Sequence, residues 1–294
     1  MTDVIAGVAR AAMLVTLNVS IYSGRKKDAR TQAEVVAAKN SGSSRAASVY
    51  KALFSDNPEL DAITKFQARA RARHYQLTLP WQDGGARLLP TKALLDYTQE
   101  MNRYSAEFDR LVDTFLNRYD TSVAAAAFKL GTLFDRDEYP TREQAAGKFR
   151  FEIAYAPVPS SGDFRLDIEA EVQQELVDKF ERRLETQLAA AQQDAWSRMH
   201  EVLTRLKDRL TLDEEGKRKK FHDPMVTNAQ ELCVLLTQLN VTNDPALEKA
   251  RQQLEEAMAG VDPQELRKEE SARLITLNKV NNILDAFDWG ADEE

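Results

Sequence analysis

Three short groups of basic residues are the parts of this sequence whose types and spacing are best suited to chemistry. The first group ends the run LVTLNVSIYSGRKK, the second is spread through KFQARARARHYQ, and the third lies in EEGKRKKFHDP. Cations interspersed with aromatic rings suit single-stranded nucleic acid, because cations contact phosphates and rings stack on bases. The candidate nucleic-acid-binding residues are Arg25, Lys26, Lys27, Arg30, Arg69, Arg71, Arg73, Lys217, Arg218, Lys219 and Lys220, with Tyr22, Phe66 and Tyr75 as stacking residues.

A solvated surface is the alternative interpretation of each basic group taken alone. In an extended chain the three arginines of the second group would share one face, whereas on a helix they would fan around the axis. The three groups together make phosphate binding an equal alternative. Steeply salt-dependent binding is then expected, because cations displaced from the phosphates are released.

No catalytic or metal-binding motif is recognised in the sequence. His74, His200 and His222 have no acidic or cysteine partner at the spacing of metal ligands. Cys233 lies in the apolar run ELCVLLTQL, which favours a small buried side chain over a nucleophile. No glycine-rich loop of the P-loop or dinucleotide-binding type occurs. We therefore expect a non-enzymatic protein without a metal or cofactor.

The charge of the chain is polarised along its length. Residues 1–75 hold 12 Lys and Arg against 6 Asp and Glu, whereas residues 151–294 hold 18 against 30. A basic front and an acidic rear indicate nucleic-acid contact or head-to-tail assembly, so we expect a homo-oligomer. No run approaches the roughly 20 apolar residues of a membrane span, and MTDVIAGVARAAM is not a signal peptide. We expect a cytoplasmic protein that does not associate with membranes.

The C-terminal sequence NNILDAFDWGADEE mixes acidic with apolar residues. One interpretation is a fraying acidic end. The other is a tip that docks on partner proteins through Leu284, Phe287 and Trp289 and competes with nucleic acid for the basic front.

Four strands are predicted to form a small antiparallel sheet, at 14–22, 75–80, 149–155 and 163–168. The first strand rests on strict alternation of apolar and polar residues from Val15 to Tyr22. The last two strands form a predicted hairpin, FRFEIAYAPVPSSGDFRLDI, whose loop carries two prolines and a glycine.

Helices are predicted from periodicity and from capping signals. A short helix is predicted at 45–54, and Asn57 with Pro58 starts another that runs through KFQARARARHYQ. Apolar residues in 91–119 recur every 3.5 positions on average, as in a coiled coil, and the aromatics among them favour core packing. Residues 169–210 lack glycine and proline, and this rod should pack on the 91–119 helix, on a second subunit, or on both.

The C-terminal third repeats one helix-start signal, an aspartate followed by a proline, at positions 223, 244 and 262. These signals predict a helical bundle at 224–286. The fold class is therefore α+β and predominantly helical, with a small antiparallel sheet, a long antiparallel coiled-coil-like helical pair and a C-terminal helical bundle. The predicted regions are a basic α+β region at 1–168, a long helix at 169–210 and an acidic helical region with an acidic-aromatic tail at 211–294.

Three stretches carry a family resemblance: LVTLNVSIYSGRKK, FLNRYDTSVAAAAFKLGTLFDRDEYPT and FRFEIAYAPVPSSGDFRLDI. They resemble an uncharacterised family of tailed-phage and prophage proteins, labelled as a domain of unknown function, over residues 13–185. Members of that family are encoded in phage replication or recombination regions, sometimes near a MoxR-like AAA+ ATPase. The resemblance implies phage DNA metabolism in a bacterial cytoplasm, and it supplies no catalytic residues.

Two functions are therefore expected from the sequence. The first is a non-enzymatic nucleic-acid-binding protein of phage DNA metabolism that prefers single-stranded DNA. The alternative is a scaffold or adaptor that partners an AAA+ ATPase or another replication protein, in which the acidic rear and the tail matter most. An enzyme is the third hypothesis, and no motif supports it.

Overall fold

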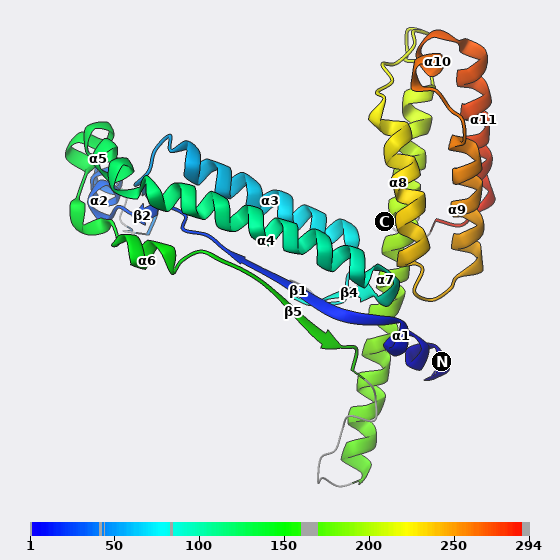
Figure 1. Ribbon diagram of the computed structural model, residues 1–294, viewed down its shortest axis with the longest axis horizontal. Coiled ribbons are helices and arrows are strands. Elements are labelled where there is room, and N and C mark those ends of the chain that lie inside the picture. Colours follow the sequence, from blue (N-terminus) through cyan, green and yellow to red (C-terminus); the bar gives the residue numbers. More distant parts are fainter. Residues whose placement is uncertain (1, 41–42, 44, 83–84, 160–169, 290–294) are drawn as a thin grey trace. The chain divides into compact units, whose positions relative to one another are not determined.

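The chain begins with a helix and a strand, and helices dominate the rest of its length (Figure 1). The computed structural model describes residues 2–40, 43, 45–82, 85–159 and 170–289. The elements in chain order are α1 Thr2–Ala11, β1 Ala12–Ser20, β2 Arg25–Lys27, α2 Ala29–Ala38, β3 Tyr50–Ala52, α3 Pro58–Leu77, β4 Arg87–Pro90, η1 Thr91–Ala93, α4 Leu94–Asn117, α5 Tyr119–Leu130, η2 Gly131–Leu133, η3 Arg136–Glu138, α6 Arg142–Ala146, β5 Arg150–Pro157, α7 Ala170–Leu210, α8 Pro224–Leu239, α9 Pro245–Met258, α10 Pro263–Lys268 and α11 Glu270–Ala286.

The chain divides into two compact units, each built from segments that are distant in the sequence. Unit 1 comprises Met1–Thr16, Tyr75–Tyr97 and Tyr155–Glu294, and unit 2 comprises Leu17–His74 and Thr98–Ala154. Each unit has its own cluster of buried apolar residues. The predicted fold class, a predominantly helical α+β protein with a small antiparallel sheet, is confirmed.

The predicted opening strand is confirmed as β1. It is the central strand of a three-stranded sheet, in the order β4-β1-β5, and its first half pairs antiparallel with β4 from Ala12↔Pro90 to Val15↔Arg87. Val15 is fully buried and Val19 is buried, as the alternation predicts for apolar residues on one side. The strand predicted at 149–155 is also confirmed, as β5.

Two predicted elements are wrong. Residues 75–80 do not form a strand, because α3 continues to Leu77 and only Leu79 makes an isolated bridge, to Leu88. Residues 45–54 do not form a helix, because β3 occupies residues 50–52 and pairs with β2 in a separate two-stranded sheet. The strand predicted at 163–168 lies outside the described residues.

Unit 2 contains an antiparallel pair of helices, α3 and α4, over a core rich in aromatic rings. Phe66 of α3 lies 5.9 Å from Phe108 of α4, ring centre to ring centre, and both are buried. The helix predicted at 91–119 is confirmed and its aromatic stripe is core. Its antiparallel partner, however, is the 58–77 helix rather than the 169–210 helix, because Phe66, Arg69 and Arg73 of α3 supply the contacts.

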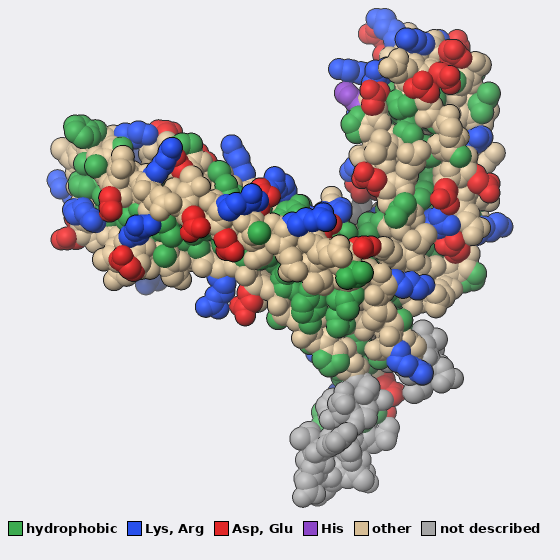
Figure 2. All heavy atoms as spheres, viewed as in Figure 1, with side chains coloured by type: hydrophobic (Ala, Val, Ile, Leu, Met, Phe, Trp, Pro, Cys, Tyr) green, Lys and Arg blue, Asp and Glu red, His purple; other side chains and the backbone are tan. Residues whose placement is uncertain are grey.

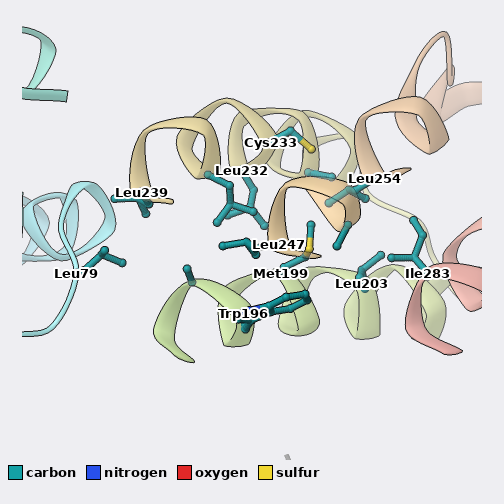
Figure 3. Packing of buried hydrophobic residues seen from close by; sticks show 14 of the residues in the cluster. Leu79, Trp196, Met199, Leu203, Leu232, Cys233, Leu239, Leu247, Leu254 and Ile283 are labelled. Atoms are coloured by element: carbon teal, nitrogen blue, oxygen red, sulfur yellow. The ribbon is translucent and has the colours of Figure 1, made fainter. Parts of the chain in front are cut away.

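Unit 1 contains α7, a 41-residue helix that confirms the predicted rod, and the four helices α8 to α11. Helix α7 packs against α8 and α11, and α9 packs against both of those helices. Figure 3 shows the core between them, where Trp196, Met199 and Leu203 of α7 face Leu232, Leu247 and Ile283. Cys233 lies in the same core, and burial raises the pKa of its thiol to about 11, as expected for a structural cysteine.

All three aspartate–proline pairs start helices, as predicted. Asp244 and Asp262 accept hydrogen bonds from backbone amides of the first turn and are true N-caps. Asp223 is an exception, because its backbone is helical and its carboxylate pairs with Arg267 instead. Among the described residues, no helix has the combination of length and apolar composition that a membrane span requires.

Candidate nucleic-acid interface

The first basic group lies on a two-stranded ribbon in unit 2, which we call the basic ribbon and define as β2 with β3. Its register pairs Arg25 with Ala52, Lys26 with Lys51 and Lys27 with Tyr50. Because side chains alternate along a strand and paired residues share a face, Arg25, Lys27 and Tyr50 lie on one face, and Lys26 and Lys51 lie on the other. Arg25 and Lys27 are about 7 Å apart along the strand, so each can reach a separate phosphate.

Gly24 sets the geometry of the chain where β1 leads into the basic ribbon. Its φ of +60° favours glycine, and a Cβ there would lie 2.9 Å from Leu60 Cδ2 and 3.2 Å from Phe54 Cδ2. The carbonyl of Gly24 accepts a hydrogen bond from the Leu53 amide at 2.7 Å, which joins the two strands at the end of the ribbon. The glycine that interrupts the opening alternation therefore turns the chain and places the three cations.

The cations of β2 are exposed and remain available to an anion. Across the described residues, Arg25, Lys26 and Lys27 form no ion pair, and Tyr50 on the same ribbon is 61% exposed. The neighbouring Asp28 does not neutralise them, because it caps α2. Its carboxylate accepts hydrogen bonds from the Thr31 amide at 3.0 Å and the Thr31 hydroxyl at 2.7 Å, and these bonds lower its pKa.

The predicted site residue Arg30 and the ribbon residue Lys51 are both partnered. Arg30 on α2 is exposed and pairs with Glu34 one turn later at 3.4 Å. Lys51 of β3 pairs with Glu138 and donates a hydrogen bond to the Leu133 carbonyl at 3.0 Å. Lys51 therefore attaches the ribbon to η2 and η3, whereas the β2 cations do not serve the fold.

The second basic group lies on helix α3, and its three arginines are engaged in contacts within unit 2. Arg73 forms a two-pronged pair with Glu100 of α4, at 2.6 and 3.0 Å, and Arg69 pairs with Glu107. Arg71 points to β1, where it donates a hydrogen bond to the Val19 carbonyl at 3.0 Å. The three arginines fan around α3, as expected for a helix, and they attach it to its neighbours.

Two of the three predicted stacking residues are buried and are therefore not available to stack on a base. Phe66 is 2% exposed and Tyr22 is 8% exposed, because both rings belong to the aromatic core of unit 2. Tyr75 is 51% exposed but lies in unit 1, where the Arg87 guanidinium sits 4.8 Å from its ring centre. Tyr50 is the aromatic residue that sequence reasoning missed, and its cross-strand position opposite Lys27 is the signal that identifies it.

The third basic group lies in unit 1 and is largely paired. Lys219 pairs with Asp208 at 2.6 Å, and Lys217 pairs with Glu215. Arg218 donates a hydrogen bond to the Lys268 carbonyl at 2.9 Å and lies near Glu270. Lys220 is exposed and has no ion pair with any described residue. This loop retains one available cation, compared with three on β2.

The predicted partner-docking residues at the C-terminal end pack on α7 instead of projecting outward. The Trp289 ring is 5.4 Å from Trp196 and is stacked on His200 at 5.2 Å. The Phe287 ring lies 5.8 Å from Trp196, and Leu284 packs against the same core. The described part of the tail is therefore folded on unit 1, and docking of these three residues on a partner stays a prediction.

A hollow of about 280 Å³ in unit 2 lies between the start of α3 and α5. Its two cations face two carboxylates, since Arg118 pairs with Glu59 and Lys129 lies 4.0 Å from Asp56. The hollow has no excess charge to hold an anion. Within the described ranges, no three His, Cys, Asp or Glu side chains gather as metal ligands do.

Comparison with known proteins gives a family without an assigned activity. Residues 10–213 match the family model described as "Protein of unknown function (DUF3150)". No curated protein and no solved structure matches the chain.

Proposed function

We propose that this chain, which belongs to the family Protein of unknown function (DUF3150), is a non-enzymatic protein that binds single-stranded nucleic acid through its basic ribbon. The observation that carries the proposal is the shared exposed face of Arg25, Lys27 and Tyr50. A single strand offers partners for both parts of this face, because its phosphates meet the cations and its unstacked bases meet the ring. A duplex would engage only the cations, since its bases are already stacked.

The charge balance of the two units supports this site. Unit 2 carries 19 Lys and Arg against 15 Asp and Glu, whereas unit 1 carries 21 against 32. The long-range field of unit 2 therefore attracts a polyanion, while that of unit 1 repels it. The cations of β2 are exposed and have no carboxylate partner among the described residues.

The biological setting that we propose is phage DNA metabolism in the cytoplasm of a bacterial host. This setting is supported by the resemblance of residues 13–185 to tailed-phage and prophage proteins from replication and recombination regions. Single-stranded DNA is an intermediate of both processes, so a protein that coats or anneals it would have a substrate there.

Fluorescence anisotropy of a labelled oligothymidylate, titrated at several salt concentrations, tests the site. For single strands, each phosphate contact contributes about 0.7 to the slope of log affinity against log salt. The double variant R25Q/K27Q should therefore reduce the magnitude of that slope by about 1.4 and weaken binding most at low salt. A duplex of equal length should bind the wild-type chain more weakly than the single strand does.

The matched control is K217Q/K220Q, which also removes two cations but in the loop of unit 1. It should leave the slope unchanged. Equal losses in both double variants would show that total charge, and not the basic ribbon, governs binding. A flat titration of the wild-type chain at low salt would overturn the proposed function and direct the search to protein partners.

A further inference from the structure

Phe128 is the most exposed large apolar residue of unit 2, with 91% of its surface open to solvent. Helix α5 buries Tyr119, Val123 and Ala126 on its inner face. Phe128 lies on the opposite face, since the helical period places it about 180° from Tyr119. A phenylalanine ring on the solvent face of a short, alanine-rich helix contributes nothing to the core, so its role is to be sought outside the unit.

Two lysine side chains fasten the end of α5 to the segment that contains the basic ribbon. Lys129, the residue after Phe128, donates a hydrogen bond to the Ser55 carbonyl at 3.0 Å, just beyond β3. Lys51 of β3 donates a hydrogen bond to the Leu133 carbonyl at 3.0 Å, just beyond α5. The exposed rings of Phe128 and Tyr50 are therefore carried by elements that are held together within unit 2.

The remaining exposed large apolar side chains in the described part of unit 2 lie on η2 and α2, which adjoin α5 and the ribbon. Leu133 follows α5 and is 46% exposed, and Val35 on α2 is 37% exposed. Helix α2 is joined to the ribbon by a hydrogen bond from the Asp28 amide to the Val49 carbonyl at 2.9 Å. At the end of unit 2 where Figure 1 labels α5, α2 and β2, Figure 2 shows green apolar side chains interspersed with blue cationic and red acidic ones.

We infer that Phe128 is a second base-stacking residue of the nucleic-acid site, an inference that rests on the proposed function of the basic ribbon. The ligand it implies is a single strand with at least two unstacked bases, one on Tyr50 and one on Phe128, and with phosphates on Arg25 and Lys27. Charge complementarity selects this ligand, because Arg25 and Lys27 share the face of the ribbon that carries Tyr50 and attract a polyanion. The two most exposed large apolar side chains in the described part of unit 2 are both aromatic, and every base has a face that stacks on such a ring.

The variants F128A and F128W test this inference with two oligomers of equal length, an oligothymidylate and an abasic strand. F128A removes an exposed ring and no core contact, so circular dichroism should match that of the wild type. It should weaken oligothymidylate binding about five- to a hundredfold and leave abasic binding unchanged. F128W should retain the affinity, and its indole emission should be quenched by the bound bases. L95A, which truncates a 67% exposed leucine of unit 1, is the matched control and should change neither.

Each other outcome has a definite meaning. If R25Q/K27Q loses binding but F128A keeps full affinity for oligothymidylate, the inference is wrong and the proposed function stands. Equal losses of F128A on both oligomers would rule out stacking. If F128A instead loses only its binding to phosphatidylserine vesicles, the exposed end of α5 is a membrane surface and the inference is wrong. If the wild-type chain binds neither oligomer at low salt, both proposals fall.

Discussion

The buried cores of unit 1 and unit 2 are built from different kinds of side chain. Seven of the sixteen buried residues in the described core of unit 2 are aromatic, against three of thirty-one in that of unit 1. Unit 2 buries few but large rings, which meet edge to face around Phe54. Unit 1 buries many small aliphatic side chains between helices. Aromatic pairs are worth about 0.5–1.5 kcal/mol beyond the area they bury, so a small core can be stabilised by a few rings.

The structural arginines of unit 1 also differ in use from the β2 cations of unit 2. In unit 1, Arg273 is 3% exposed and donates hydrogen bonds to backbone carbonyls at the end of α7, and Arg198 does the same at the end of α3. A cation at a helix C-terminus satisfies free carbonyls and opposes the helix dipole. In unit 2, the side chains of Arg25 and Lys27 make no such bond to any described residue. The number of cations in a unit therefore does not locate a binding surface, because some of them are arginines whose side chains are engaged in stabilising the fold.

The largest expected effect on stability comes from the aromatic core of unit 2. F54A removes the ring that contacts Tyr22, Phe115, Tyr119 and Tyr139. Loss of a buried phenylalanine side chain should cost about 3–5 kcal/mol in the free energy of unfolding, measured by urea titration with circular dichroism. F128A is the control, since it deletes the same side chain at an exposed site and should cost less than about 0.5 kcal/mol. Similar costs would show that the ring cluster is not the core of unit 2.

The next largest effect on the free energy of unfolding concerns Arg273, a buried arginine of unit 1. Arg273 donates hydrogen bonds to the carbonyls of Leu210 at 2.8 Å, Leu266 at 3.2 Å and Lys219 at 3.2 Å. R273M keeps the length of the side chain but leaves these carbonyls without a donor, so it should cost about 2–4 kcal/mol. Tryptophan fluorescence during urea unfolding is the measurement, because all three tryptophans lie in unit 1.

The control for R273M is R205M on α7. The Arg205 side chain is 68% exposed and, among the described residues, pairs with Glu201 alone, so its loss should cost less than about 0.5 kcal/mol. R273K should give an intermediate loss, because an ammonium has three donors and cannot reproduce the planar fork. Comparable losses in R205M and R273M would contradict the claim that arginines stabilise unit 1 from inside.

A smaller loss in the free energy of unfolding, with a defined pH dependence, is expected when Asp244 is substituted. Partial burial opposes its ionisation, but hydrogen bonds from Gln192 at 2.8 Å, Trp196 at 3.1 Å and two backbone amides outweigh burial and lower its pKa. D244N retains a cap but loses an acceptor for the α7 side chains, so it should cost about 1 kcal/mol at neutral pH.

The sign of the pH dependence is set by the lowered pKa. A carboxylate whose pKa is lower in the folded than in the unfolded chain stabilises the fold above the unfolded value, and this contribution is lost as the pH falls through the folded value. The gap in stability between wild type and D244N should therefore narrow below the ordinary pKa of 3.8. D262N is the control for the loss of a capping carboxylate alone, because Asp262 caps α10 through the Gln264 amide. A gap that widens in acid would contradict the assignment.

Local patterns predicted the elements whose formation depends on neighbours in sequence. The β1 alternation, the 91–119 seam, the 169–210 rod and the aspartate–proline starts all became elements, because each is specified within a few turns of chain. The predicted strand at 75–80 is wrong because contacts from outside the segment decide its structure. Arg87 and Arg198, distant in sequence from Tyr75, donate hydrogen bonds to the carbonyls of residues 75–78 and allow α3 to continue to Leu77.

The candidate site could be predicted only in part. The cations of β2 were visible as a charge run, but Tyr50 was not, because β2 and β3 are three residues each and pair across more than twenty residues. Phe66 and Tyr22 were assigned to the surface because sequence periodicity cannot show how many faces of an element are covered. Helix α3 contacts α4 through Phe66 and β1 through Gln67, so residues on several of its faces are enclosed.

The smallest expected effect tests whether Trp289 at the C-terminal end serves the fold or is left for docking on a partner. Trp289 stacks on His200, and its indole donates a hydrogen bond to the Leu284 carbonyl at 2.8 Å. If these contacts serve the fold, W289A should cost about 1 kcal/mol. It should also raise acrylamide quenching of the remaining tryptophans, since Trp196 is 9% exposed while Trp289 covers it. W289F keeps an aromatic ring and should recover most of both effects. Unchanged stability and quenching in W289A would instead mean that the ring is not needed by unit 1, which would favour its use in docking on a partner.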